Sequence, residues 1–150
     1  MKTVLLALFL SAIQETAAPR VFVRVDSGAV EAGDRKRVKE LSDSVRDIRE
    51  QIQKRVDLVN ADERAEADVL VTVLDRRIEV SPTGENNYGG ELKQTHYQSR
   101  YILTYRVETG GQAHETETAL AGAFVTWKRV AGTVAKEIGI WARHYQASEK

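Results

Sequence analysis

Residues 66–80, Glu-Ala-Asp-Val-Leu-Val-Thr-Val-Leu-Asp-Arg-Arg-Ile-Glu-Val, decide the fold that we expect for this chain. Within them the run Val69–Leu74 alternates, so that three valines point to one face and two leucines and a threonine point to the other. Both faces are apolar, which is typical of a strand at the centre of a sheet that is covered on both sides. The stretch therefore predicts a central strand around which the other elements are arranged.

The composition indicates one domain with a sizeable core. The chain has 150 residues, of which 42% are hydrophobic, and this length leaves no room for a second domain. Lysine plus arginine equals aspartate plus glutamate at 22 each, so no overall positive field would hold a nucleic acid. Cysteine is absent, which excludes disulfides, thiol catalysis and thiolate metal sites.

The first residues have the pattern of a secretory signal peptide. Lys2 precedes an uncharged apolar run, Val4–Ile13, which is too short to span a bilayer as a helix. We expect residues 1–18 to be a signal peptide, residues 19–150 to form a single α+β domain, and the protein to be periplasmic or secreted. The alternative is that the apolar run is a buried amino-terminal helix or strand.

Two amphipathic helices are expected on one face of the sheet. The first follows a strand at residues 21–26 and an N-cap at Gly33-Asp34, and the second follows an N-cap at Thr126. Their apolar positions recur every three or four residues: Val38, Leu41, Val45, Ile48 and Ile52 in the first helix, and Trp127, Val130, Val134, Ile138, Trp141 and Tyr145 in the second. The narrow stripe of the first helix is also typical of a short coiled-coil seam, through which two chains would form a homodimer.

The other strands follow from alternation and turn residues. The segment His96–Glu108 alternates between apolar and polar residues, as in an antiparallel strand with one solvated face, and Gly110-Gly111 predicts a tight hairpin after it. The expected cross-strand pairs are Tyr105 with Thr116, Leu103 with Thr118 and Arg106 with Glu115. With a short strand at Val56–Val59, we expect the order β-α-β-β-β-β-α and a mostly antiparallel sheet of four to five strands.

Basic residues crowd the start of the first helix, where the helix dipole favours anions. They are Arg35, Lys36, Arg37 and Lys39. These residues form either a solvated basic face or a patch for an anionic partner, such as a lipid headgroup, a phosphorylated polymer or an acidic protein. Lys128 and Arg129 begin the second helix in a similar way, and the number of intervening strands decides whether the two clusters meet.

Turn-forming residues are concentrated in Ser81–Gly90, which predicts a loop. A long loop between paired strands is either filler or a functional surface. The candidate binding surface combines this loop with the solvated strand face: Asn86, Asn87, Tyr88, Glu91, Arg100 and Arg106. A tyrosine among glycines and asparagines would suit contact with a peptide or a sugar.

No motif in the sequence determines a chemistry. The histidines His96, His114 and His144 are isolated from one another, so we expect neither a metal site nor a cofactor. The sequence has no Walker loop, no dinucleotide-binding fingerprint and no nucleophile elbow. We therefore expect a protein without enzymatic activity, and a hydrolase built on scattered acids is the alternative.

Three stretches, Ala67–Val73, Tyr105–Gly111 and Ala131–Trp141, carry a resemblance that extends over most of residues 21–147. Together with the element order, they resemble bacterial envelope domains: the amino-terminal domain of the Tol-Pal translocation protein B, the curli secretion component and the outer-membrane activators of penicillin-binding proteins. The resemblance implies a periplasmic, non-catalytic module that binds other envelope proteins. No binding residue of these families has a motif here that carries over.

The function that we expect is that of an exported, non-catalytic binding or assembly module of the cell envelope. It would be peripheral to the membrane at most, and its partner would be another protein or an anionic envelope component. The alternative is a secreted enzyme or small-ligand-binding protein with a pocket between residues 81–95 and the sheet. A buried carboxylate or histidine in a cleft would favour the alternative, whereas a flat exposed patch or a free sheet edge would favour the module.

Overall fold

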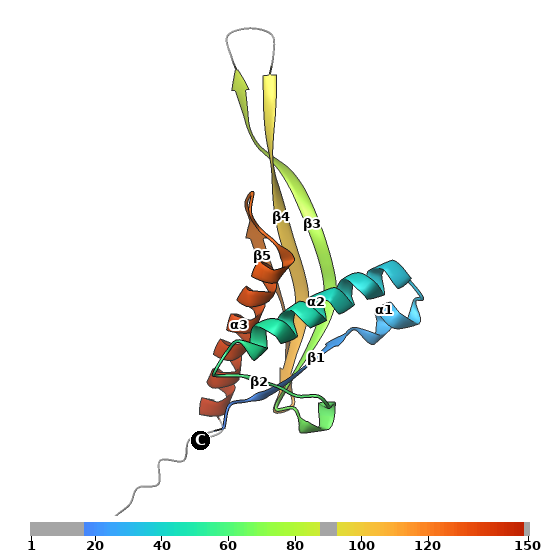
Figure 1. The fold of residues 1–150 in the computed structure, drawn as a ribbon, viewed down its shortest axis with the longest axis vertical. Coiled ribbons are helices and arrows are strands. Elements are labelled where there is room, and N and C mark those ends of the chain that lie inside the picture. The colour runs from blue at the N-terminus through green and yellow to red at the C-terminus, as the bar shows by residue number, and fades with distance from the viewer. Residues whose placement is uncertain (1–16, 88–92, 149–150) are drawn as a thin grey trace, which may run out of the picture.

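A mixed sheet of five strands, in the order β2-β1-β3-β4-β5, carries the helices of this chain (Figure 1). The computed structural model describes residues 17–87 and 93–148. Its elements are β1 (Arg20–Val25), α1 (Ser27–Glu31), α2 (Arg35–Gln53), β2 (Val59–Asn60), a 3₁₀ turn η1 (Arg64–Glu66), β3 (Val69–Asn87), β4 (Lys93–Thr109), β5 (Gln112–Ala121) and α3 (Trp127–Ser148). β1 runs parallel to β2 and β3, and the pairs β3–β4 and β4–β5 are antiparallel. The expected α+β class is confirmed; the short helix α1 and the parallel pairs were not expected.

The stretch that begins at Val69 is the central strand, as predicted. β3 lies between β1 on one side and β4 on the other. Its side chains are buried on both faces near its start, because Val71 is 0% exposed on one face and Thr72 is 2% exposed on the other. A strand with neighbours on both edges and cover on both faces has little room for polar residues, which explains its apolar sequence.

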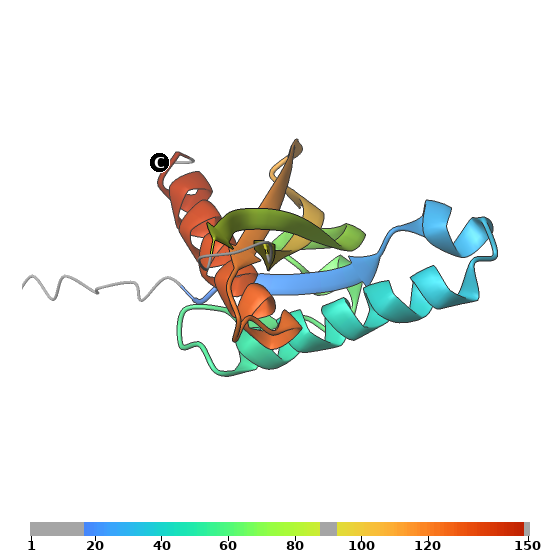
Figure 2. The ribbon, with the colours of Figure 1, turned by 90° about the horizontal axis from the view of Figure 1, so that it is seen from above.

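The helices α2 and α3 pack against the same face of the sheet (Figure 2). Asp34 caps α2, because its Oδ1 accepts a hydrogen bond of 3.1 Å from the backbone N–H of Arg37. Most of the two predicted apolar stripes lies in one core with the sheet: Leu41, Ile48 and Ile52 of α2 and Val130, Val134 and Ile138 of α3 are buried. The stripe of α2 is thus covered within a single chain, so a homodimer would have to use another face of this helix.

The predicted strand at Val56–Val59 is wrong in its position. Strand β2 comprises Val59–Asn60 alone, and Val56 is 98% exposed. The segment is held by short contacts with the start of β1, because the N–H of Val59 donates to the Pro19 carbonyl and that of Ala61 donates to the Val21 carbonyl. Local apolar character was not enough to locate a strand whose pairing depends on a distant segment.

The predicted loop at Ser81–Gly90 is wrong for residues 81–87, which continue β3. They pair with residues 93–98 of β4, and a register shift between Pro82 and Gly84 absorbs one extra residue, Thr83. Beyond Val73, β1 no longer pairs with β3, so this part of β3 has a neighbour on one side only. An edge strand tolerates proline and glycine far better than a central strand does. Residues 88–90 lie outside the described residues.

Strands β3 and β4 therefore form a long, twisted two-stranded ribbon that projects beyond the rest of the sheet (Figure 1). We call residues 78–87 of β3 and 93–99 of β4 the arm. The end of the arm and the carboxyl-terminal end of α3 lie at opposite ends of the molecule. The remaining strands, the helices and the core lie at the root of the arm.

Candidate functional site

The arm has two edges that no other strand covers in the described part of the chain. β1 pairs with β3 only over Val69–Val73, and β5 pairs with β4 only over Arg100–Thr109. Beyond these points β3 and β4 pair only with each other. A strand edge without a neighbour presents backbone N–H and C=O groups to which another extended segment can bind.

One face of the arm carries exposed apolar side chains. Residues that pair across antiparallel strands share a face, and the pairs Ile78 with Tyr101 and Pro82 with Tyr97 belong to the face on which α2 and α3 pack further down. Ile78 is 49% exposed, Val80 62% and Tyr97 68%, because the helices do not reach this far. We call Ile78, Val80, Pro82 and Tyr97 the apolar stripe.

The root of the arm is fastened to both helices by Arg76. Its Nη1 donates hydrogen bonds to the Glu40 carbonyl at 3.0 Å and to Ser44 Oγ at 3.3 Å, and both acceptors belong to α2. Its guanidinium also lies over the ring of Trp127, the first residue of α3. The Tyr101 ring packs in a T-shaped arrangement with the same tryptophan, with the ring centroids 5.1 Å apart. These contacts hold the arm in one orientation relative to the body.

The connection between β5 and α3 adds another exposed aromatic side chain beside the arm. The N–H of Gly122 donates to the Ser99 carbonyl at 3.4 Å, so this connection lies against β4 where the arm begins. Phe124, two residues later, is 86% exposed. Apolar groups at the surface therefore continue from the arm onto the adjoining connection.

The structure describes four of the predicted binding residues, Asn86, Asn87, Arg100 and Arg106, and it does not bring these four together. Asn86 and Asn87 are the last residues of β3, whereas Tyr88 and Glu91 lie outside the described residues. Arg100 pairs with Glu79, and Arg106 pairs with Thr72 much nearer the root. At about 3.4 Å per strand residue, Arg100 and Arg106 are roughly 20 Å apart. These positions share a ribbon but do not form one compact site.

Ion pairs occupy the face of β3 and β4 that points away from the helices. Arg77 is central to them, because it contacts Glu117 at 3.1 Å, Glu79 at 3.2 Å and Asp75 at 3.3 Å. The hydrogen bonds that Arg77 donates to these carboxylates, the one to Glu117 first, raise the pKa of its guanidinium. The predicted pair of Arg106 with Glu115 is confirmed at 3.3 Å. This face is solvated and internally paired, which suits it poorly to recognition of a charged ligand.

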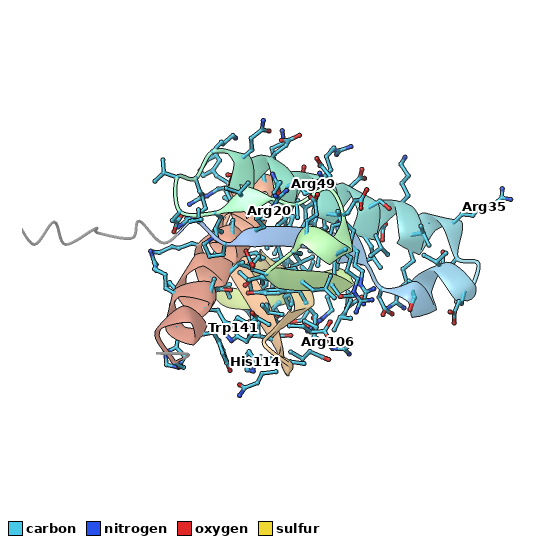
Figure 3. All side chains as sticks on the ribbon, turned by 90° about the horizontal axis from the view of Figure 1, so that it is seen from below. Arg20, Arg35, Arg49, Arg106, His114 and Trp141 are labelled. Carbon is cyan, nitrogen blue, oxygen red and sulfur yellow. The ribbon has the colours of Figure 1, made fainter. Side chains whose placement is uncertain are left out.

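The basic residues at the start of α2 are all exposed. Arg37 is partly engaged, because its Nη2 donates to the Leu74 carbonyl at 3.3 Å and lies 3.8 Å from Asp75. Arg35 lies at the end of α2 that projects past the sheet (Figure 3). Lys128 pairs instead with Glu50, near the other end of α2. At 1.5 Å per helical residue, Glu50 is about 22 Å from Arg35. The two basic clusters therefore do not meet, and an anionic partner of Arg35, Lys36, Arg37 and Lys39 stays a prediction.

Sequence reasoning missed a carboxylate between the sheet and α3. Glu137 of α3 accepts hydrogen bonds at Oε2 from the hydroxyls of Tyr105 on β4 and Thr118 on β5. Burial, followed by the contact with Glu137, raises the pKa of Tyr105, so this hydroxyl remains a donor. A signal was present in the sequence: Thr116 and Thr118 occupy the inner face of β5, where apolar residues would be usual.

Neither of two larger cavities is lined by the described residues of the segment 81–95, which are 81–87 and 93–95. One of about 530 Å³ is lined by residues from both ends and from the middle of the chain, including Pro19, Asp68 and Tyr145. Another, of about 800 Å³, lies between α2 and β2. Within residues 17–87 and 93–148, no three His, Asp or Glu side chains are grouped as a metal ion would require. In the same part of the chain, no helix combines the length and apolar character needed to cross a membrane.

Comparison with solved structures finds a distant similarity. A minor lipoprotein from Acinetobacter baumannii, solved by crystallography at 2.35 Å, is 14% identical in sequence, with a TM-score of 0.38 over 87% of this chain and 94% of that chain. No protein-family model and no curated protein matches the sequence. A similarity of this size identifies none of the envelope families named above and supports no conclusion about function.

Proposed function

We propose that the protein is an exported, non-catalytic binding module of the cell envelope, and that it binds another protein through the arm. The observation that carries this proposal is the combination, on one ribbon, of two strand edges without a neighbouring strand and the apolar stripe. A free edge and an exposed patch are the features that distinguish a binding module from an enzyme with a cleft.

The arm offers a partner three sources of binding free energy. An extended segment can pair with either edge through main-chain hydrogen bonds. Covering the apolar stripe removes Ile78, Val80 and Tyr97 from water, which contributes about 25 cal/mol for each Å² of apolar surface buried. Because Arg76 and Trp127 already hold the root of the arm in place, less conformational entropy is lost on binding.

The envelope location is supported by the signal-like pattern of residues 1–18. Its test is the intact mass of the protein recovered from fractionated cells. The expected result is a protein outside the cytoplasm that lacks the signal segment. A full-length protein in the cytoplasm would contradict export and would leave a binding module that acts elsewhere.

The arm is tested by replacing Tyr97 with a photoreactive amino acid in living cells, followed by irradiation. The matched control places the same group at Gln98, which is adjacent, also exposed to solvent and on the opposite face. We expect a discrete cross-linked partner from position 97 and much less from position 98. The purified partner should then bind the wild-type chain and bind the Ile78→Ser/Val80→Ser variant less tightly.

Equal cross-linking from both positions, or unchanged affinity of the folded double variant for the purified partner, would contradict a role for the apolar stripe. The variant should fold normally, because both side chains are already exposed to water. Circular dichroism and the urea midpoint provide that control.

A further inference from the structure

A small cavity opens between β4, β5 and α3, well away from the arm. Its volume is about 180 Å³, and its walls include Tyr105, His114, Thr116, Glu137 and Trp141. Trp141 and His114 lie on the same side of the molecule when it is seen from below (Figure 3). Alternate residues of the two strands and one side of α3 thus bring polar and aromatic groups together.

Within the described residues, the carboxylate of Glu137 has hydrogen-bond donors but no cationic partner. Its Oε2 accepts from the hydroxyls of Tyr105 and Thr118, which are both neutral. Among the ion pairs of the described residues, none includes Glu137, although this side chain is only partly exposed. Moving a carboxylate out of water without a positive partner is costly, and a cationic ligand in the cavity would offset part of that cost.

The remaining walls indicate what kind of cation would fit. Trp141 lines the cavity, and the face of a tryptophan ring attracts organic cations. Val107 and Ile138 supply apolar surface beside it. A divalent metal ion would need several oxygen ligands, whereas one carboxylate, an aromatic ring and aliphatic walls match an alkylammonium group.

The volume limits the size of the ligand. At about 30 Å³ for each water molecule, a cavity of about 180 Å³ corresponds to about six water-sized groups. This is room for a primary amine with a short alkyl chain inside the cavity.

We propose that this cavity binds a small organic ammonium ion, with Glu137 pairing with its charge and Trp141 packing against it. The Tyr105 and Thr118 hydroxyls hold the carboxylate in position, and Val107 and Ile138 contact the alkyl chain. The site is independent of the arm, so either proposal can fail without the other.

The test uses the folded chain and the two tryptophans as reporters. The chain has only Trp127 and Trp141, and Trp127 lies at the start of α3, next to the root of the arm. The indole N–H signals are followed by NMR during titration with n-butylammonium chloride. Parallel titrations use 1-butanol, which has the same alkyl chain without the charge, and sodium chloride at the same ionic strength.

We expect a saturable shift of the Trp141 signal with butylammonium, little change of the Trp127 signal, and no saturation with butanol or sodium chloride. Glu137→Gln should weaken binding at least about tenfold, because it removes the charge and keeps the shape. Glu117→Gln is the matched control, since this exposed residue pairs with Arg77 on the opposite face of the sheet, and it should bind as the wild type does.

A Trp141 signal that does not saturate, or equal binding of butanol, would overturn the proposal. Unchanged affinity of the folded Glu137→Gln variant would overturn it too. If circular dichroism shows that this variant is unfolded, Trp141→Leu takes its place, with the backbone N–H signal of residue 141 as the reporter. Binding of butylammonium to that variant should be several-fold weaker, and unchanged affinity would count against the site.

Discussion

The guanidinium carbon of Arg76 lies 4.2 Å from the centroid of the Trp127 ring. The same guanidinium donates to the Glu40 carbonyl and to Ser44, so that one side chain joins β3 to both helices. These contacts of Arg76 fasten the root of the arm to α2 and α3.

Arg76→Ala should lower the free energy of unfolding by about 2 kcal/mol, because it removes hydrogen bonds from a charged group and a cation–π contact. Urea unfolding followed by circular dichroism measures the change. Arg64→Ala, in the exposed turn η1, is the matched control and should change stability by less than about 0.5 kcal/mol. Equal effects of the two variants would show that Arg76 does not fasten the arm.

Two glycines of α3 should respond differently to alanine. A Cβ atom at position 132 would lie 3.5 Å from Gln51 Oε1, which is an ordinary contact, whereas at position 139 it would lie 3.0 Å from Asp57 Oδ2 and 3.2 Å from Arg55 Nη2. Gly132→Ala should therefore stabilise the protein by about 0.5–1 kcal/mol through helix propensity. Gly139→Ala should gain less or lose stability, because the Arg55–Asp57 pair has to move. A larger gain at position 139 in thermal unfolding would refute this packing argument.

Asp57 should make stability depend on acid pH. Arg55 donates two hydrogen bonds to it, at 2.8 and 2.7 Å, and these lower the pKa of Asp57 below its usual 3.8. A carboxylate whose pKa is lowered in the folded state stabilises the fold above 3.8 and loses that contribution as the pH falls through its folded-state value.

The stability lost in Asp57→Asn should thus be greatest near neutral pH and shrink as the pH falls below about 4. Urea unfolding between about pH 6 and about pH 3 measures this difference. Arg55→Met should show the same trend, because it removes the cause of the shift. A difference from wild type that stays constant with pH would argue against the pair.

Tyr105 should make stability depend on alkaline pH. Burial raises its pKa above the usual 10.0, so the folded protein keeps a proton that the unfolded chain releases. Above pH 10.0, the usual pKa of tyrosine, the unfolded state therefore binds fewer protons than the folded state, and stability falls as the pH rises. Tyr105→Phe should lose stability less steeply than the wild type between about pH 9 and about pH 11. Parallel pH profiles of the two proteins in urea unfolding would contradict this.

Local patterns were sufficient where the structure depends on neighbouring residues. The alternation after Val69, the cap at Asp34 and the glycine pair at 110–111 each determine a local geometry, and the structure confirms all three. The hairpin register was predictable to the residue, because a tight turn leaves only one way to pair the strands that it joins.

Tertiary structure decided those strands and contacts whose partners lie far away in the sequence. Residues 81–87 contain proline, glycine and asparagine, yet they form a strand because β4 pairs with them residue by residue. The parallel pairing of β1 with β3 brings together segments about fifty positions apart in the sequence, and no local pattern encodes such a contact. The proposed binding surfaces also depend on distant partners. The arm exists because β3 and β4 extend beyond β1 and β5. Glu137 contacts Tyr105 only because α3 packs on the sheet. By itself, the sequence determined the two long helices, the start of β3 and the hairpin, together with their buried faces, whereas only the fold determined which groups remain exposed and which polar groups meet.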